Sequence, residues 1–435
     1  MQTRFAERQL KDPAVAASEQ ILRKCVHCGF CTATCPTYVL LGDELDSPRG
    51  RIYLIKDMLE NDRPATAEVV RHVDRCLSCL SCMTTCPSGV HYQHLIDHAR
   101  VHIERTYRRP FADRWLRSAL GFVLPYPRRV RIALALAALA RPLAPLLPRS
   151  LRAMLDLARP RPASAMPPPA AEPKVAKRAR VALLEGCVQT VIAPEINAAT
   201  RRLLERAGAE VVTVGGCCGA LVQHLGQEQR AHALAASIVE RLHAEIEGRG
   251  LDAIVANASG CGTHAKDLGY LFRNDRQLAA KAAAVSAKAR DVTQTLTQLG
   301  LPPRASGVPR VSVAYHSPCS MQHGQKVDAE PRALLTAAGF EVREIAEGHL
   351  CCGSAGTYNV LQPQIATRLR ERKLANIGRT QAAVVATGNV GCITQLATGD
   401  GPPVVHTVEL LDWATGGPPP RALQSGGGIA SDAAP

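Results

Sequence analysis

The chain has 435 residues, sixteen cysteines and a net charge of +14, a length that exceeds a single hydrophobic core and predicts two to four domains. Sixteen cysteines suit a disulfide framework only in a small secreted protein, and Met1–Leu10 is polar, with no apolar signal segment. We therefore expect a cytoplasmic chain whose cysteines are thiols or metal ligands. The longest apolar run, Ile132–Ala140, has nine residues and is too short to span a membrane.

Eight of the cysteines lie in two runs with the same spacing, Cys-x-x-Cys-x-x-Cys-x-x-x-Cys-Pro. This is the spacing of bacterial ferredoxins, in which three thiolates of a run bind one [4Fe–4S] cluster and the fourth binds the other. The predicted ligands of cluster 1 are Cys25, Cys28, Cys31 and Cys86. The predicted ligands of cluster 2 are Cys35, Cys76, Cys79 and Cys82.

Neighbouring residues fit this prediction. Gly29 has no side chain and tolerates a positive φ, so the first run can approach the inorganic sulfides closely. Pro36 and Pro87 end the two loops and direct the chain into the next element. A pair of zinc ribbons is the alternative, since zinc also takes four cysteines. A ribbon draws two ligands from each Cys-x-x-Cys pair, however, and leaves the other two cysteines of each run unexplained.

Residues 1–110 are predicted to form an all-α, two-cluster ferredoxin-like domain. The hydrophobic pattern indicates helices at Arg51–Glu60, Thr66–Asp74 and Tyr92–Glu104. Forty residues separate Cys35 from Cys76, which is more than a compact two-cluster ferredoxin needs. The extra length is what the first two helices would occupy.

Residues 111–175 are predicted to be a basic connector rich in proline and alanine. Fourteen arginines but only three acidic residues lie between Arg100 and Arg161, and prolines mark a boundary at 160–175. The basic segment could bind nucleic acid, but no recognition motif accompanies it, and we expect no nucleic-acid partner. Contact with an anionic membrane surface and packing against the protein itself or a partner subunit both stay open.

An internal repeat with a period near 131 residues follows the connector. Leu203–Val211 matches Leu334–Val342, and Ala253–Ala256 matches Ala383–Ala386. Two related domains at 176–300 and 301–415 are the simplest explanation. The remaining 416–435 are biased toward proline, glycine, serine and alanine, and we expect a disordered tail there.

Each copy of the repeat alternates short β-branched runs with helical patterns, which predicts α/β units around a parallel sheet. Cysteines follow the expected strands, and the carboxyl ends of such strands form ligand crevices, where helix N-termini also favour thiolate. A redox or metal site is therefore predicted, with buried core cysteines as the alternative. The candidates are Cys187, Cys217, Cys218 and Cys261 in the first copy and Cys319, Cys351, Cys352 and Cys392 in the second.

Several segments carry a family resemblance. The Cys-Cys-Gly triplets at 217–219 and 351–353 resemble the cysteine-rich domain of heterodisulfide reductase. With a two-cluster ferredoxin in front, the architecture is similar to lactate-utilisation iron–sulfur proteins and to the iron–sulfur subunits of anaerobic glycerol-3-phosphate dehydrogenase and of glycolate oxidase. The segments that favour the last family are 35–38, 42–51, 74–82, 259–262 and 391–394.

The resemblance implies an electron-transfer subunit that receives electrons from FAD-containing partner subunits and passes them toward a quinone, serving the conversion of glycolate to glyoxylate. It also implies a cytoplasmic location, with peripheral contact at the inner membrane as a further expectation. The chain has no Gly-x-Gly-x-x-Gly after a strand and no phosphate-binding loop. We therefore expect no flavin or NAD in this chain, and the two-electron chemistry in a partner.

Three other functions stay open. The chain could serve a D- or L-lactate dehydrogenase or a glycerol-3-phosphate dehydrogenase, since substrate selectivity would lie in the partner. Its Cys-Cys-Gly half could itself be a redox catalyst like heterodisulfide reductase. It could also be a scaffold that tethers flavin subunits to the membrane.

The end of each repeat departs from the heterodisulfide reductase pattern, in which a final Cys-x-x-Cys lets five cysteines hold a non-cubane [4Fe–4S] cluster. Here the residue three positions after Cys261 is His264, and the residue three positions after Cys392 is Gln395. A four-thiolate iron–sulfur site, a zinc site and a vestigial site therefore all stay open. His264 could be a ligand or a solvated loop residue.

Three arginines lie close in sequence to the ferredoxin-type runs, namely Arg49, Arg51 and Arg75. Positive charge near a cluster stabilises its reduced form and should raise its reduction potential. Simple surface ion pairs are the alternative for all three.

Overall fold

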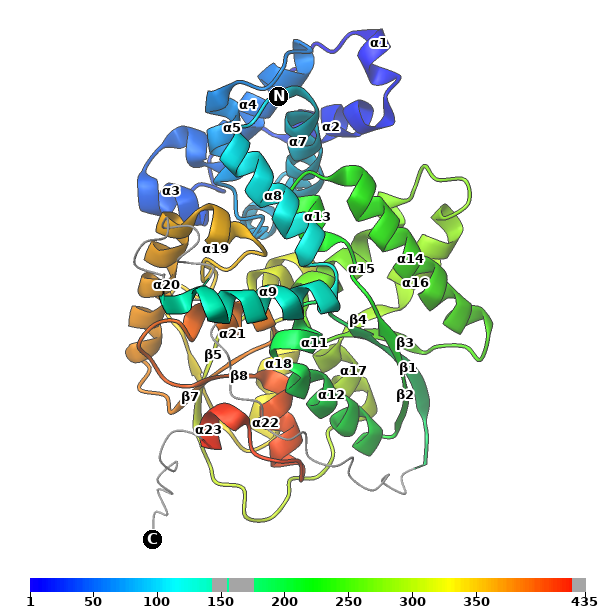
Figure 1. Cartoon of the computed structure of the whole chain (residues 1–435), viewed down its shortest axis with the longest axis vertical. Coiled ribbons are helices and arrows are strands. Elements are labelled where there is room, and N and C mark those ends of the chain that lie inside the picture. Colours follow the sequence, from blue (N-terminus) through cyan, green and yellow to red (C-terminus); the bar gives the residue numbers. More distant parts are fainter. Residues whose placement is uncertain (143–154, 156–175, 425–435) are drawn as a thin grey trace.

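The computed structural model describes residues 1–142, Leu155 and 176–424 (Figure 1). The proline-rich boundary predicted at 160–175 and most of the predicted tail lie outside these residues. A helical N-terminal part sits at one end of the molecule, and two sheets with their covering helices form the rest.

The N-terminal part is all-helical, as predicted. Its elements are α1 (Glu7–Leu10), α2 (Pro13–Lys24), α3 (Pro36–Leu41), the 3₁₀ turn η1 (Glu44–Asp46), α4 (Pro48–Glu60), α5 (Ala67–Asp74), α6 (Ser81–Thr85) and α7 (Tyr92–Thr106). The helices predicted from hydrophobic spacing are confirmed as α4, α5 and α7. Side chains of Ser47 and Thr66 cap the first turns of α4 and α5, which places both starts by a local signal.

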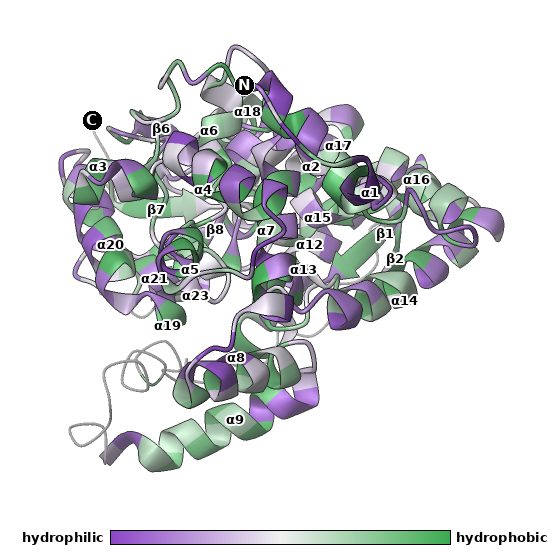
Figure 2. Cartoon of the chain, turned by 90° about the horizontal axis from the view of Figure 1, so that it is seen from above, coloured by the Kyte–Doolittle hydropathy of each residue, from purple (hydrophilic) through white to green (hydrophobic). Residues whose placement is uncertain are grey.

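Two further helices, α8 (Phe111–Val123) and α9 (Pro127–Ala140), lie along one side of the body (Figure 2). The segment is anchored by ion pairs of buried Arg109 and Arg117 with Asp74, at 2.7 and 2.8 Å. These two arginines are therefore internal and do not belong to a basic surface. Several apolar side chains of the pair are nevertheless exposed, namely Phe111, Trp115, Phe122, Tyr126, Ile132, Leu136 and Leu139.

The first Cys-Cys-Gly domain is built on a four-stranded parallel sheet in the order β2-β1-β3-β4. Its strands are β1 (Ala179–Glu185), β2 (Ala209–Gly215), β3 (Ala253–Ala256) and β4 (Ala289–Asp291). Its helices are α11 (Gln189–Ile192), α12 (Pro194–Arg206), α13 (Ala220–His224), α14 (Glu228–Glu247), α15 (Ser259–Leu271), α16 (Ala279–Lys288) and α17 (Val292–Leu299).

The second domain repeats this topology in a parallel sheet ordered β6-β5-β7-β8. Its strands are β5 (Ser312–Tyr315), β6 (Glu341–Glu344), β7 (Val384–Thr387) and β8 (Val404–His406). Its helices are the π-helix η3 (Ser320–Gln325), α18 (Ala329–Ala337), α19 (Tyr358–Leu361), α20 (Pro363–Gly378), α21 (Val390–Leu396), α22 (Thr407–Ala414) and α23 (Arg421–Gln424). The matching strand order confirms the predicted fold class.

The two copies share one hydrophobic core. Leu203 and Val255 of the first belong to the same buried cluster as Val313 and Leu411 of the second. Polar contacts also cross between them. His406 Nε2 lies 2.8 Å from the carbonyl oxygen of Asn257, and Asp412 accepts hydrogen bonds from Arg202 and Arg206.

Residues 416–424 of the predicted tail lie in the described part of the chain. They include α23, whose Leu423 is 9% exposed and belongs to the shared core. These nine residues therefore differ from the disordered tail that their composition predicts, because one leucine finds an apolar contact. Residues 425–435 lie outside the described part.

Candidate functional site

The four cysteines predicted for cluster 1 line one cavity of the ferredoxin-like domain. Cys25, Cys28 and Cys31 come from the loop between α2 and α3, and Cys86 ends α6. Cys28 is exposed, whereas Cys25 is buried. The donor set is four thiols around a single space, which is the chemistry that a [4Fe–4S] cluster requires. These residues therefore fit such a cluster.

Gly29 has the conformation that the sequence predicts. Its φ is +84°, and a Cβ there would lie 2.7 Å from Nη1 of Arg49. A side chain at this position would be strained and would also displace the arginine. Arg49 itself donates to the carbonyl oxygen of His27 at 3.3 Å and pairs with Glu44 at 2.7 Å. The arginine thus braces the loop that carries Cys28.

The thiol of Cys31, which is partly buried, is influenced by its neighbours. Burial, reinforced by the neighbouring Cys25, raises the pKa of Cys31 to about 11. A thiol with such a pKa is protonated at neutral pH. A metal that binds it must therefore displace a proton, and metal binding and folding are coupled through this exchange.

The second predicted set, Cys35, Cys76, Cys79 and Cys82, lies deeper. Cys35 precedes α3, Cys76 follows α5, and Cys82 lies on α6. Burial raises the pKa of Cys82 well above its usual value, and Cys79, Cys76 and Cys35 add to this shift. The four thiols of this set are therefore electrostatic neighbours, and Cys31 of the first set also acts on Cys82. Cys82 also lines the cavity of the first set, so the two sets adjoin.

A buried polar network positions the second set. The Arg51 side chain is 1% exposed, and its Nη1 lies 3.8 Å from Sγ of Cys35. The same guanidinium donates to Thr37 and Asp46, at 3.0 and 3.3 Å. Arg75 also donates to Asp46, at 2.6 Å. Arg51 is thus no surface ion pair but a buried cation beside a candidate ligand, whereas Arg49 retains a partly exposed partner.

The cysteines of the Cys-Cys-Gly domains gather at the carboxyl ends of the strands, as predicted. In the first domain they follow β1 and β2 and lie on the first turn of α15. The neighbouring Cys217 and burial raise the pKa of Cys187, and the neighbouring Cys218 and burial raise that of Cys261. Cys261 is the least buried of the four.

The second domain also brings its four cysteines together. Cys319 Sγ lies 3.7 Å from Cys351 Sγ, and the sulfurs of Cys352 and Cys392 lie within 4.8 Å of each other. Asn389 donates to Sγ of Cys392 at 3.5 Å. The thiols therefore form one continuous chain of contacts at the ends of three strands.

The glycine of each Cys-Cys-Gly triplet has a defined role. Gly219 and Gly353 have φ values of +95° and +91°, and an added Cβ would lie 2.7 Å from the carbonyl oxygen of Ala231 in α14 and 2.5 Å from that of Ala366 in α20, respectively. Each glycine N–H also points at the first cysteine of its triplet, with an N···Sγ distance of 3.4 Å in both copies. Only glycine satisfies both requirements, which explains the recurring triplet.

The ferredoxin-like domain and the second Cys-Cys-Gly domain meet directly at their cysteines. Cys79 packs in one buried cluster with Cys351, and Cys319 lies against the same cluster. The hydroxyl of Tyr358 donates to the carbonyl oxygen of Arg75 at 3.0 Å and fixes this contact. The second thiol set and the thiols of the second domain are therefore adjacent across an apolar seam.

Known families match the same regions. A 4Fe-4S dicluster domain matches residues 21–90, and a cysteine-rich domain matches residues 181–266 and again 313–397. The glycolate oxidase iron-sulfur subunit of Escherichia coli is 41% identical over 95% of this chain and 99% of its own length. The chain belongs to the family of glycolate oxidase iron–sulfur subunits.

Two further relatives are similar to this chain at lower identity. A probable glycolate oxidase iron-sulfur subunit of Bacillus subtilis is 31% identical over 92% of each chain. Lactate utilization protein A of an Exiguobacterium strain is 25% identical and covers 53% of this chain and 96% of its own length. The resemblance to the glycolate oxidase family that the sequence indicates is confirmed.

The fifth ligand position of this family member is filled differently in its two copies. His264 is not a solvated loop residue, because it is 7% exposed, and burial lowers its pKa to about 4. Gln395 is also buried, yet it is already used, because its amide donates to Ala366 and accepts from Asn359. Gln395 is therefore a structural residue and leaves its site without a fifth donor from that position.

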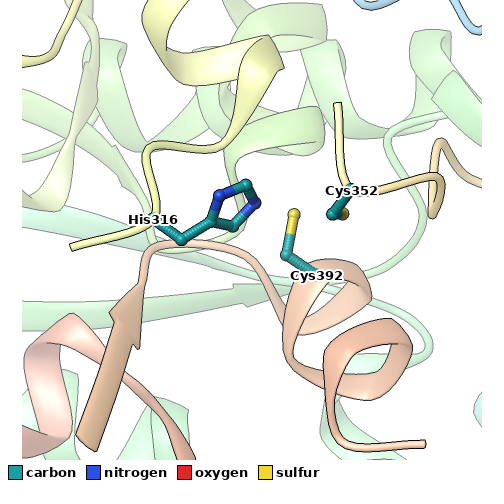
Figure 3. A group of neighbouring side chains, drawn as sticks. All are labelled: His316, Cys352 and Cys392. Carbon is teal, nitrogen blue, oxygen red and sulfur yellow. The ribbon is translucent and has the colours of Figure 1, made fainter. Parts of the chain in front are cut away.

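A histidine that the sequence analysis missed stands in the second copy of this glycolate oxidase family subunit. His316 follows β5 directly, and a ring nitrogen lies within 4.8 Å of the sulfurs of Cys352 and Cys392 (Figure 3). The available signal was its position three residues before Cys319.

A second feature that the sequence did not indicate is a cavity of about 360 Å³ between α7 and the helices α14 and α15. His94 Nε2 lies 2.9 Å from Asp267 Oδ1 in its wall. The His94 ring also stacks on Tyr270, with 3.4 Å between the centroids. In this iron–sulfur subunit the cavity adjoins the helix that carries Cys261.

Proposed function

We propose that this chain is the electron-transfer subunit of a complex that oxidises glycolate to glyoxylate, with FAD in its partner subunits. The observation that carries the proposal is the pair of adjoining four-thiol sets in contact with a third group of thiols. The E. coli relative, which is named a glycolate oxidase iron-sulfur subunit, covers nearly the whole chain. Such a subunit needs no substrate pocket of its own, since a flavin handles the two-electron step.

The residues that would hold the clusters follow from the two thiol sets. Cys25, Cys28, Cys31 and Cys86 would hold the first, and Cys35, Cys76, Cys79 and Cys82 the second. A [4Fe–4S] cluster, when bound, supplies one-electron chemistry at a potential set by charge, hydrogen bonds and exposure. Arg51 and Tyr92 contribute such bonds, to Cys35 and Cys76 at 3.8 and 3.9 Å.

The flavin partner is proposed to dock on the loop that carries Cys28. Cys28 is exposed, and the neighbouring Val26 and Phe30 are 65% and 63% exposed. Two large apolar side chains beside an exposed candidate ligand favour a protein contact at this point. The second thiol set is more buried, so the first is the one a partner can reach.

The acceptor is proposed to be a quinone that enters the cavity beside α7. A volume of about 360 Å³ suits a small ligand. A quinone needs two electrons and two protons to become a quinol. His94 and Asp267, paired at 2.9 Å, can donate and recover protons there. Tyr270 and Phe272 supply aromatic wall.

Peripheral contact with an anionic membrane is proposed for α9. Ile132, Leu136 and Leu139 are 60–77% exposed and lie at helical spacing, and Arg128, Arg129 and Arg131 are in the first turns of the same helix. Apolar residues with flanking arginines fit a surface-lying helix. Within the described residues, none of the helices is both long and apolar enough to cross a bilayer.

Anaerobic purification tests the main proposal. We expect about eight iron and eight sulfide per chain from the two ferredoxin-type sets, two interacting EPR signals on reduction, and co-purification with FAD subunits that turn over glycolate. Cys28→Ser should remove one signal and abolish transfer from glycolate to a quinone. A metal-free chain that still supports this transfer would contradict the proposal.

Two variant pairs test the finer parts. His94→Ala or Asp267→Asn should slow reduction of a soluble quinone without affecting reduction of a dye, whereas His102→Ala on the same helix should change neither. Leu136→Glu should weaken binding to vesicles that contain phosphatidylglycerol, whereas Leu10→Glu, remote in sequence, should not. If Leu136→Glu instead releases the flavin subunit, α9 is a subunit contact.

A further inference from the structure

The second Cys-Cys-Gly domain contains a buried histidine that has no hydrogen-bond partner. His316 is 2% exposed, and neither Nδ1 nor Nε2 has one. A buried polar group left unpaired loses its hydrogen bonds to water without replacement. An imidazole with both nitrogens unpaired is therefore costly, unless it binds something other than this chain.

The surroundings of His316 indicate what it binds. Its ring is directed toward the sulfurs of Cys352 and Cys392 (Figure 3), and one ligand atom from each of the three residues lies within 4.8 Å of the others. Cys352 and Cys392 are 2% and 3% exposed. Imidazole nitrogen with thiolate sulfur is a donor set that takes zinc or the iron of an iron–sulfur cluster.

The three residues come from different parts of the domain. His316 follows β5, Cys352 is on the loop after β6, and Cys392 is on the first turn of α21. The parallel sheet brings these segments to one edge, which is where such folds bind ligands. Three separate segments therefore converge on one point.

A buried cation lies near the same thiols. The amino group of Lys373, on α20, is almost fully buried and donates to the carbonyl oxygen of Glu347 at 2.8 Å. Burial lowers the pKa of this lysine, and the nearby Cys352, Cys351 and Glu347 oppose that shift. A buried ammonium needs hydrogen bonds and compensating negative charge. Glu347 supplies part of that charge, and thiolates bound to a metal would add to it.

We propose that His316 is an imidazole ligand of a metal centre in the second Cys-Cys-Gly domain, together with Cys352 and Cys392. Cys351 and Cys319 continue the same group of thiols and complete the donor set. The proposal deepens the proposed function, because it assigns a ligand to a site adjoining Cys79. It does not depend on how the two ferredoxin-type sets are occupied.

This assignment accounts for the missing fifth cysteine of the second copy. Gln395 occupies that position and is held by Ala366 and Asn359. His316, by contrast, lies three residues before the first cysteine of this copy, Cys319, and not after the last. An imidazole in place of a thiolate also removes one negative charge from the site. If the metal is the iron of a cluster, this exchange raises its reduction potential, as histidine ligation does elsewhere.

The first copy does not offer the same group. The residue three positions before Cys187 is Leu184, which is 1% exposed. His264 is buried there, but in the described part of the chain only His316 forms a group of ligand atoms with two cysteines. We therefore assign the imidazole ligand to the second copy alone.

Metal content and nitrogen spectroscopy of the anaerobically purified full chain test the proposal. A nitrogen bound directly to a metal should be detected. For iron, protein labelled with ¹⁵N-histidine should show a ¹⁵N hyperfine coupling in EPR; for zinc, the extended X-ray absorption fine structure should show a nitrogen shell. His316→Ala should lose either one zinc or the iron and sulfide of one cluster per chain. His349→Ala, a histidine two residues from Cys351, should lose nothing.

The ferredoxin-type signals separate this proposal from the main one. They should persist in His316→Ala, which also shows that the variant is folded. His316→Cys should keep the metal and lose the nitrogen signal. If His316→Ala fails to fold, the wild-type spectra decide. A wild-type chain with no metal-bound nitrogen, or a His316→Ala chain with full metal content, would overturn the proposal.

Discussion

The two Cys-Cys-Gly copies have the same strand order, the same four cysteine positions and the same strained glycine, yet their fifth positions differ. The first copy has His264 where the heterodisulfide reductase pattern has a cysteine, and the second has Gln395 there but His316 elsewhere. The shared scaffold therefore fixes four thiols, whereas the remaining donor is free to vary. A repeat can keep its architecture while its two sites acquire different properties.

The largest effect is expected at the glycines that both copies share, and it tests whether the two scaffolds are equivalent. Gly219→Ala and Gly353→Ala should each lower the free energy of unfolding by about 3 kcal/mol, because each adds backbone strain and a clash with a backbone oxygen. Denaturant unfolding measures the loss. Gly378→Ala, where nothing lies within 4 Å, should be neutral or stabilising. A clear difference between the two copies would show that the scaffold is not equivalent.

A smaller effect is expected at the contact between the copies. Asp412 is 1% exposed on its side chain and pairs with Arg202 and Arg206 of the other copy. Asp412→Asn should cost about 2 kcal/mol, less than a fully buried pair, since both arginines keep some access to water. Asp400→Asn, an exposed position in the same domain, should cost nothing measurable. Unchanged unfolding of Asp412→Asn would mean that the shared apolar core alone joins the copies.

Gln395 distinguishes a structural residue from a ligand. Its two hydrogen bonds, of 3.2 and 3.0 Å, are internal, so Gln395→Ala should cost about 1 to 2 kcal/mol of unfolding free energy. The metal content of the anaerobically purified chain should stay the same. Metal loss in this variant, measured by elemental analysis, would place a ligand at the position where the structure has a hydrogen-bonded amide.

The smallest effect is expected for His264. Its Nε2 has no hydrogen-bond partner, and the structure does not group it with the thiols, so His264→Ala should change stability by about 1 kcal/mol or less. Metal content should also be retained, in contrast to His316→Ala. If both variants lose metal equally, each copy uses one histidine and the two sites are more alike than their sequences.

Much of this architecture could be predicted from residue spacing. The helices α4, α5 and α7 followed from apolar periodicity, and strands β1, β2 and β3 from β-branched runs that precede cysteines. Both signals are local, so a single sequence carries them. The sharing of one core by the copies was not predictable, because Leu203 and Val313 meet only through the tertiary arrangement.

The site was predictable to the extent that cysteine spacing describes it. The contact of Cys79 with Cys351 joins residues far apart in the chain, and no motif encodes it. The role of Arg51 was predicted only in part, because its sequence position suggests proximity to a cluster but does not show that the side chain is buried. His316 was not predicted as a site residue because a lone histidine after a strand has no specific spacing. Only the fold brings it to the thiols.

The exposure of Cys28 also makes its sulfur accessible to oxidants. A sulfur that a partner protein can approach is equally open to dioxygen and peroxide, whereas Cys79 and Cys351 are shielded by their apolar surroundings. Oxidative damage should therefore begin at the outer loop and spare the interior. A bound partner subunit would then shield this loop from oxidants, and the isolated chain would be oxidised in air faster than the assembled complex.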